Sequence, residues 1–239
     1  MRKNGYLYLI PNTIGNYEVD RNIPVEVKNI IEKLNYFIVE NEKVARKYIK
    51  LVSPYRSQEK ITMYPLNKHT SLNESYSYLN ICLKGQSIGL ISDAGCPGIA
   101  DPGALIVSKA HNLNIKVKPL VGPSSILLAL MASGMNGQNF AFNGYLPIEK
   151  KERFKKIKFF EKRSLNENQS QIFIETPYRN NSLFNDLINI LSNSTELCIA
   201  TDISLNSERI KSESVDNWKK INKEDLNKRP SIFILNSGF

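Results

Sequence analysis

The sequence predicts an α/β protein of two domains, with a parallel sheet in the N-terminal domain and a mixed sheet in the C-terminal α/β domain. In the first half, short apolar segments typical of strands alternate with segments of helical periodicity, the pattern of a parallel sheet flanked by helices. The predicted strands lie near residues 6–10, 36–39, 87–91 and 116–120. The first helix is predicted over residues 24–34, since Val27, Ile30, Ile31 and Leu34 share one face.

The second half predicts strands at 171–175, 197–203, 208–214 and 231–236, and a helix over 179–191. At 239 residues, of which 41% are hydrophobic, the chain is long enough for two domains with separate cores. The composition shifts near residues 136–139, after an apolar helix that ends at Gly134. We therefore expect an N-terminal domain at residues 1–139 and a C-terminal domain at residues 140–239.

The loop at residues 92–103 follows the predicted strand 87–91 and precedes a helix over 104–110. Three glycines, two prolines and two aspartates lie within these residues, which favours an irregular loop. Open α/β sheets bind ligands at the carboxyl ends of their strands, and glycine lets a backbone approach a ligand closely. Taken alone, the loop is explained equally well by a tight turn without a ligand.

Two further loops follow predicted strands. Residues 122–125, Gly-Pro-Ser-Ser, open the apolar helix 126–132. A helix start offers unpaired N–H groups and a positive dipole end to an anion or a polar nucleoside edge. A plain serine cap explains that run taken alone. The third loop, residues 11–16, follows the opening strand. Three strand-end loops in one half of the chain predict a shared pocket.

In this order, the loops and their flanking segments resemble the tetrapyrrole methylase superfamily of S-adenosylmethionine-dependent methyltransferases. Within it they are most similar to the ribosomal RNA small-subunit methyltransferase I family. The matching segments are LYLIPNTIGN, SDAGCPGIADPG, VKPLVGPSSILLALMASG, FNGYLP, FIETPYRNN and RPSIFILNSG. The resemblance implies a tetrapyrrole-methylase-like fold, S-adenosylmethionine as cofactor, and methyl transfer to a cytidine ribose 2'-oxygen in 16S ribosomal RNA. It also implies a homodimer.

The same resemblance implies which residues bind the cofactor, in a cleft to which both domains contribute. Those expected from the first domain are Ile10, Pro11, Gly15, Asp93, Gly95, Cys96, Ser124, Ser125 and Ile126. Those expected from the second are Leu146, Ala200 and Pro230. Core packing is the alternative role for the apolar members, and a turn without a ligand is the alternative for Asp93.

Two segments depart from the family pattern. The first loop of the family usually reads Pro-Thr-Pro-Ile-Gly-Asn, whereas Asn12 and Thr13 replace the central pair here. The family also carries Ala-Glu-Asp-Thr-Arg after its second strand. This chain has Val-Glu-Asn-Glu-Lys at residues 39–43, and its nearest arginine is Arg46. If that stretch places the RNA, the substitutions bear on both substrate and activity.

The chain carries a net charge of +9, and the excess is concentrated in residues 149–163, with eight Lys or Arg against three Glu. Phe154, Ile157 and either Phe159 or Phe160 predict the apolar face of an amphipathic helix there. Its basic face suits the phosphates of RNA, although a solvated helix is the alternative. The expected RNA-binding residues are Lys150, Lys151, Arg153, Lys155, Lys156 and, from the second-domain motif, Arg179.

A general base would help the reaction, because a ribose hydroxyl is weakly acidic. Asp101 and Glu175 are the candidates. No metal-binding motif is present, so no metal is expected. Cys82, Cys96 and Cys198 show no paired spacing, which predicts free thiols in a reducing compartment. No apolar run approaches the roughly 20 residues of a membrane span, and we expect a cytoplasmic protein.

Two alternatives to the ribosomal RNA methyltransferase stay open. One is a methyltransferase for a small tetrapyrrole, precorrin-like or other acceptor, with the same cofactor site. The other is a non-catalytic RNA-binding relative, in which the altered loop and the Asn-Glu-Lys stretch have ended turnover. Affinity for the cofactor separates the non-catalytic relative from the two kinds of methyltransferase. Salt-sensitive RNA binding separates the ribosomal RNA methyltransferase from the methyltransferase for a small acceptor.

Overall fold

The computed structural model describes residues 4–15, 19–221 and 225–238, and the chain divides into two compact units. Unit 1 is Met1–Ser124 and unit 2 is Ser125–Phe239. This division lies earlier than residue 139, where composition places the domain boundary. The reason is that the apolar helix α7 (Ser125–Ser133) packs on the second sheet, where the Ser212 hydroxyl donates to the Ser133 carbonyl at 2.7 Å.

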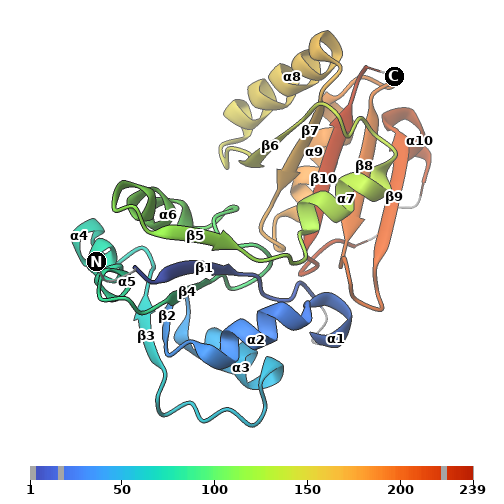
Figure 1. The fold of residues 1–239 in the computed structure, drawn as a ribbon. Helices are drawn as coiled ribbons and strands as arrows, with labels where there is room; N and C mark the ends of the chain where they lie inside the picture. The colour runs from blue at the N-terminus through green and yellow to red at the C-terminus, as the bar shows by residue number, and fades with distance from the viewer. Residues whose placement is uncertain (1–3, 16–18, 222–224, 239) are drawn as a thin grey trace. The chain divides into compact units, whose positions relative to one another are not determined.

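Unit 1 contains the predicted parallel sheet, with strand order β3-β2-β4-β1-β5 (Figure 1). The strands are β1 (Tyr6–Ile10), β2 (Tyr36–Val39), β3 (Thr62–Pro65), β4 (Ile88–Ile91) and β5 (Lys116–Pro119), and every pairing is parallel. The sequence analysis did not predict β3, a short edge strand whose side chains are exposed or half-buried. All four residues of β4 are buried, as expected for a strand covered on both faces.

Helices cover both faces of this sheet (Figure 1). Phe37 and Val39 point to a core that includes Val27 and Ile31 of α2, whereas Ile38 points to the opposite core. The first core is formed with α2 (Val25–Lys33) and α3 (Glu42–Val52), and the second with α5 (Asn80–Leu83) and α6 (Gly103–Asn112). α4 (Leu72–Ser77) contacts α6. A short helix, α1 (Val19–Asn22), precedes α2.

Unit 2 contains the mixed sheet, in the order β6-β7-β10-β8-β9. Its strands are β6 (Phe140–Tyr145), β7 (Ser170–Ile174), β8 (Glu196–Thr201), β9 (Arg209–Ser214) and β10 (Ser231–Asn236). β6 pairs with β7 in parallel, and the other pairings are antiparallel. Its core packs the sheet against α8 (Lys150–Glu167), α9 (Asn180–Ile190) and α10 (Val215–Lys220). The predicted α/β class and both sheet types are therefore confirmed.

Candidate functional site

The three predicted loops lie at the carboxyl edge of the unit 1 sheet, at a topological switch point. β1 and β4 are neighbouring strands. The chain leaves β1 for β2 on one side of this pair, and it leaves β4 for β5 on the opposite side. The connections after two such strands diverge, which leaves a crevice where open α/β sheets bind their ligands.

Asn12 joins the loop after β1 to the loop after β4. The buried Asn12 side chain donates from Nδ2 to the carbonyls of Ser92 and Asp93, both at 3.0 Å. Its main-chain N–H donates to the Gly95 carbonyl at 2.9 Å, and its Oδ1 accepts the N–H of Thr13 at 2.8 Å. Asn12, one of the two residues of this loop that depart from the family pattern, therefore connects two of the three loops.

The loop after β5 packs against the other two. The Cys96 thiol donates to the carbonyl of Pro123, with Sγ and O 3.3 Å apart. A Cβ atom on Gly122 would lie only 2.1 Å from Cβ of Pro11, so glycine is required at this approach. Gly95 adopts a φ of +68°, and a Cβ there would meet the Pro123 carbonyl at 3.5 Å. The structure thus brings the three loops into one packed cluster.

Two carboxylates lie where β2 and β4 end. Glu40 Oε1 accepts the Ser92 hydroxyl at 3.2 Å and the N–H of Asp93 at 3.1 Å. Burial raises the pKa of Glu40, and the negative charges of Asp101 and Asp93 raise it further. Asp93 is exposed, but the partial desolvation of its carboxyl by the surrounding loops still raises its pKa. Glu40 was not among the predicted site residues, although its position directly after a strand is the signal that could have indicated it.

A pocket of about 320 Å³ opens beside these loops and the first turns of α3. Asn12 and Asp93 line one part of it, and Lys43 and Lys47 of α3 line another. α3 begins here because Asn41 Oδ1 accepts the N–H groups of Lys43 and Val44, at 3.0 and 3.3 Å. The pocket combines an anionic carboxylate with two ammonium groups.

The buried Tyr48 is also part of the lining of this pocket. Its hydroxyl donates to the Pro11 carbonyl at 2.6 Å, and burial raises the pKa of the phenol. Tyr48 is therefore a neutral hydrogen-bond donor that fixes the start of the first loop. Like Lys43 and Lys47, it lies on a helix that the sequence analysis did not predict.

The two predicted bases are engaged in local hydrogen bonds. Asp101 Oδ1 accepts the N–H groups of Gly98 and Gly103, both at 2.8 Å, and so shapes the loop before α6. Glu175 lies in unit 2 and is buried. Its Oε1 accepts the Arg179 guanidinium at 2.5 Å and the N–H of Thr176 at 2.6 Å. Within the described residues, no cluster of three His, Cys, Asp or Glu side chains could hold a metal ion.

The remaining predicted cofactor residues fall into both units. In unit 1, Ile10 is fully buried in the core, Gly15 is exposed with a φ of +68°, and Ser124 is half-buried. In unit 2, Ser125 and Ile126 are half-buried at the start of α7, and Leu146 is buried in the core. The role of these residues in cofactor binding stays a prediction.

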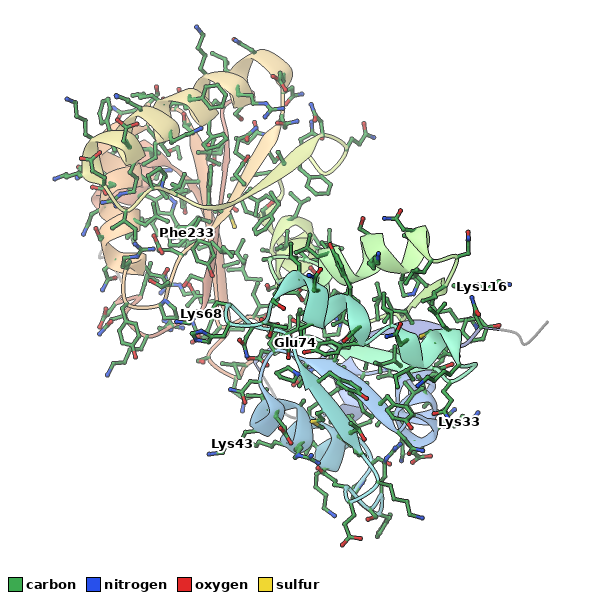
Figure 2. The ribbon with its side chains drawn as sticks, turned by 90° about the vertical axis from the view of Figure 1, so that its left-hand side faces the viewer. Lys33, Lys43, Lys68, Glu74, Lys116 and Phe233 are labelled. Atoms are coloured by element: carbon green, nitrogen blue, oxygen red, sulfur yellow. The ribbon has the colours of Figure 1, made fainter. Side chains whose placement is uncertain are left out.

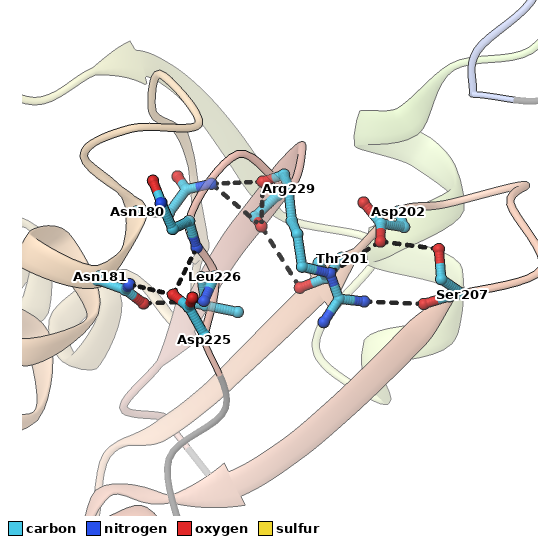
Figure 3. A network of polar contacts seen from close by, with 10 residues as sticks. Asn180, Asn181, Thr201, Asp202, Ser207, Asp225, Leu226 and Arg229 are labelled. Carbon is cyan, nitrogen blue, oxygen red and sulfur yellow. Dashed lines mark hydrogen bonds and ion pairs between the residues drawn. The ribbon is translucent and has the colours of Figure 1, made fainter.

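In unit 2, Ala200 lies in β8 and Pro230 directly precedes the neighbouring strand β10. Ala200 is buried in β8 opposite Ile232, and the N–H of Asp202 donates to the Pro230 carbonyl at 2.9 Å. Figure 3 shows the network beside them, in which Arg229 pairs with Asp202 at 2.8 Å. The Asn180 amide donates to the Arg229 carbonyl at 2.6 Å. The buried Asn180 Oδ1 has no hydrogen-bond partner within the part of the chain that the structure describes.

The basic segment is a helix, α8, and its predicted apolar face is confirmed at Ile157, which is buried, and at Phe160, which packs against the core, but not at Phe154. Arg153, Ile157, Glu161 and Ser164 are buried, whereas Phe154 and Phe159 are exposed. Arg153 is 2.5 Å from Asp186 of α9 and also donates to the Pro147 and Ile148 carbonyls. An RNA phosphate therefore cannot reach Arg153 without breaking this pair.

The other predicted RNA-binding residues differ in their surroundings. Lys150, Lys151 and Lys156 are exposed on α8, and Lys155 pairs with Glu152 at 2.7 Å. Arg179 is bound to Glu175. The exposed lysines form the basic face of this helix.

No helix within the described ranges is long and apolar enough to cross a membrane.

Solved structures define the class of protein to which this fold belongs. The methyltransferase CobJ has a TM-score of 0.65 and 13% identity, covering 98% of this chain and 95% of its own. Uroporphyrin-III C-methyltransferase from Thermus thermophilus, complexed with S-adenosyl homocysteine, has a TM-score of 0.55 and 13% identity, covering 98% of both chains. The fold is that of the two-domain tetrapyrrole methylases.

Curated relatives then define the family. Ribosomal RNA small subunit methyltransferase I of Buchnera aphidicola subsp. Schizaphis graminum is 31% identical, over 100% of this chain and 80% of the relative. The Vibrio cholerae protein of the same name is 29% identical, over 98% of this chain and 77% of its own. No family model matches the sequence. The chain belongs to the ribosomal RNA small subunit methyltransferase I family.

Proposed function

We propose that this chain is an S-adenosylmethionine-dependent methyltransferase that methylates a cytidine ribose 2'-oxygen in 16S ribosomal RNA. The observation that carries the proposal is the cluster of three strand-end loops at the switch point, joined by Asn12, Cys96 and Gly122. The names of the relatives support the RNA acceptor. The proposal also includes the homodimer that the family resemblance implies. It includes a cytoplasmic location as well, because the small ribosomal subunit is the acceptor.

The residues of unit 1 fit this cofactor chemically. S-adenosylmethionine supplies a methyl group activated by a positively charged sulfur, and it also carries an ammonium group. Asp93 offers an exposed carboxylate to a cation, and Gly95 and Gly122 keep the backbone free of side chains at the loop cluster. We assign Asp93, Gly95 and Cys96 to cofactor binding, whereas Leu146, Ala200 and Pro230 of unit 2 stay predicted cofactor residues.

The pocket against α3 suits the acceptor nucleotide. Lys43 and Lys47 supply positive charge for a phosphate, and Lys43 stands where the family pattern has arginine. A ribose hydroxyl must lose its proton during methylation. The Asp93 carboxylate lines this pocket, and one of its Oδ atoms is suited to take that proton while the other meets the cation of the cofactor. Asp101 and Glu175 serve less well, since each already accepts two or more N–H groups.

The proposal is tested with S-adenosylmethionine carrying a labelled methyl group and small ribosomal subunits from a strain that lacks a family member. Transfer to subunits supports it, and Lys43→Gln should weaken transfer more than Lys60→Gln, an exposed lysine outside the pocket. Cofactor binding without transfer to subunits or to free 16S RNA favours a small tetrapyrrole acceptor. Absence of cofactor binding favours a non-catalytic RNA-binding protein.

A further inference from the structure

One face of β1 and β5 in unit 1 presents tyrosines and lysines that the proposed methyl transfer does not use. Tyr6 is paired with Lys116 and Tyr8 with Lys118, so all four side chains project to the same face of the sheet. Farther along β1 this face is covered, because Ile10 is buried in the core with α2. At Tyr6 and Tyr8 the side chains are only half-buried, and both lysines are exposed.

The aromatic and basic groups of this face are in contact. The Lys118 Nζ atom lies 4.7 Å from the ring centroid of Tyr6 and 5.8 Å from that of Tyr8. The two rings are 5.8 Å apart and tilted by 47°. The tyrosines therefore form an aromatic floor beneath a cation, an arrangement that also accepts the flat face of a base.

Two hollows extend this face. One of about 470 Å³ lies between the tyrosines and the end of α2, where Lys33 is part of its lining. Another of about 470 Å³ is lined by Tyr6, Lys116 and Lys118. Figure 2 shows Lys33 and Lys116 toward the same end of unit 1. The described residues that line these hollows include no Asp or Glu.

We infer that this open face of β1 and β5 binds single-stranded RNA. Proteins bind unpaired RNA by stacking bases on aromatic side chains while basic groups meet the backbone phosphates. A second copy of the same face would bring Lys33, Lys116 and Lys118 against like charges, so the charge favours a polyanion. The inference deepens the proposed function, on which its biological role rests, by naming a surface for RNA that flanks the acceptor.

Anisotropy of a short labelled single-stranded RNA, without cofactor, tests the inference separately from methyl transfer. The Tyr6→Leu/Tyr8→Leu variant should bind about tenfold or more weakly, since each base-aromatic stack is lost. Lys118→Gln should reduce the slope of log affinity against log salt by about 0.7. The matched control is Lys109→Gln, because Lys109 lies 5.1 Å from the ring of Tyr76 elsewhere in unit 1 and should change neither quantity.

The Tyr6→Phe/Tyr8→Phe variant keeps both rings and should bind RNA nearly as well as the parent, which separates stacking from misfolding. Ultraviolet cross-linking should place RNA on the peptide that contains β1. Unchanged affinity in the Leu variant, or equal loss in the Phe and Leu variants, would overturn the inference. So would sedimentation showing that the Leu variant dissociates an assembly of the chain while RNA affinity stays the same.

Discussion

The side-chain amide of Asn12 donates a hydrogen bond to the main-chain carbonyl of Asp93, with nitrogen and oxygen 3.0 Å apart. This bond crosses between neighbouring strands whose connections diverge, so it fixes the relative position of two loops that the chain itself does not hold together. Asp93 is the proposed cofactor ligand and general base. Because Asn12 holds the main chain of Asp93, the orientation of the Asp93 carboxylate depends on Asn12.

Asn12→Ala should destabilise the protein by about 1–3 kcal/mol, because it removes the side-chain donor to the buried Ser92 carbonyl and to the carbonyl of Asp93. It should also weaken S-adenosylmethionine binding through the freed loop. Urea unfolding and calorimetric titration measure the two effects. Asn112→Ala, at an exposed position of α6, is the control. Equal behaviour of the two variants would show that the bond does not organise the loops.

Gly122→Ala should disrupt the loop cluster, because the added Cβ would lie 2.1 Å from Cβ of Pro11. We expect at least a tenfold loss of cofactor affinity together with a lower melting temperature. Gly137→Ala is the matched control, since a Cβ there meets no atom within 4 Å. If Gly122→Ala binds the cofactor as the parent does, the loops are not packed as described.

Glu40→Gln should stabilise the protein at neutral pH. The folded-state pKa of Glu40 is raised above its ordinary value of 4.5, mainly by burial, so folding favours the protonated form. The contribution of Glu40 to stability is therefore fully present at a pH below its ordinary pKa. That contribution is lost as the pH rises through the folded-state pKa. Glutamine mimics the protonated form.

The advantage of Glu40→Gln should therefore grow with rising pH and then level off above the folded-state pKa. Chemical unfolding at several pH values measures it, with the exposed Glu59→Gln as the control. An advantage that shrinks as the pH rises contradicts the assignment.

Arg153→Met should destabilise unit 2 by about 3–5 kcal/mol, because it leaves the Asp186 carboxylate without its buried partner. The folded fraction of this variant should bind RNA with the same salt dependence as the parent protein. Lys151→Gln, on the exposed face of α8, should show the opposite pattern. Salt titrations of RNA affinity, beside unfolding curves, separate the two roles. A reduced salt slope in folded Arg153→Met would show that the arginine meets RNA.

The sequence predicts much of the fold because its strands and loops follow local rules. β1 and β4 are short apolar segments followed by loops that contain glycine and proline, and these features predict a shared site at the strand ends. The edge strand β3 has no buried face, so its residues carry no alternating signal. β6 was also not predicted, because Gly144 and a register shift interrupt it.

The site is less predictable where partners come from distant elements. Arg153 was expected to face RNA because no local pattern shows that Asp186 neutralises it from α9. Asn12 was noted only as a departure, because its partners lie some 80 residues away. The lysines of the α3 pocket were missed since the helix itself was not predicted. Long-range pairing therefore decides which polar residues are structural and which stay available to a ligand.

The most direct test of the central claim is the chemical position of the added methyl group. Small ribosomal subunits treated with this protein and S-adenosylmethionine would be digested to nucleosides and analysed by mass spectrometry. We expect one additional 2'-O-methylcytidine per 16S RNA, and we expect it to be absent when the Asp93→Asn variant replaces the parent protein. A methyl group found only on a base, or no methyl group despite measured cofactor binding, would contradict it.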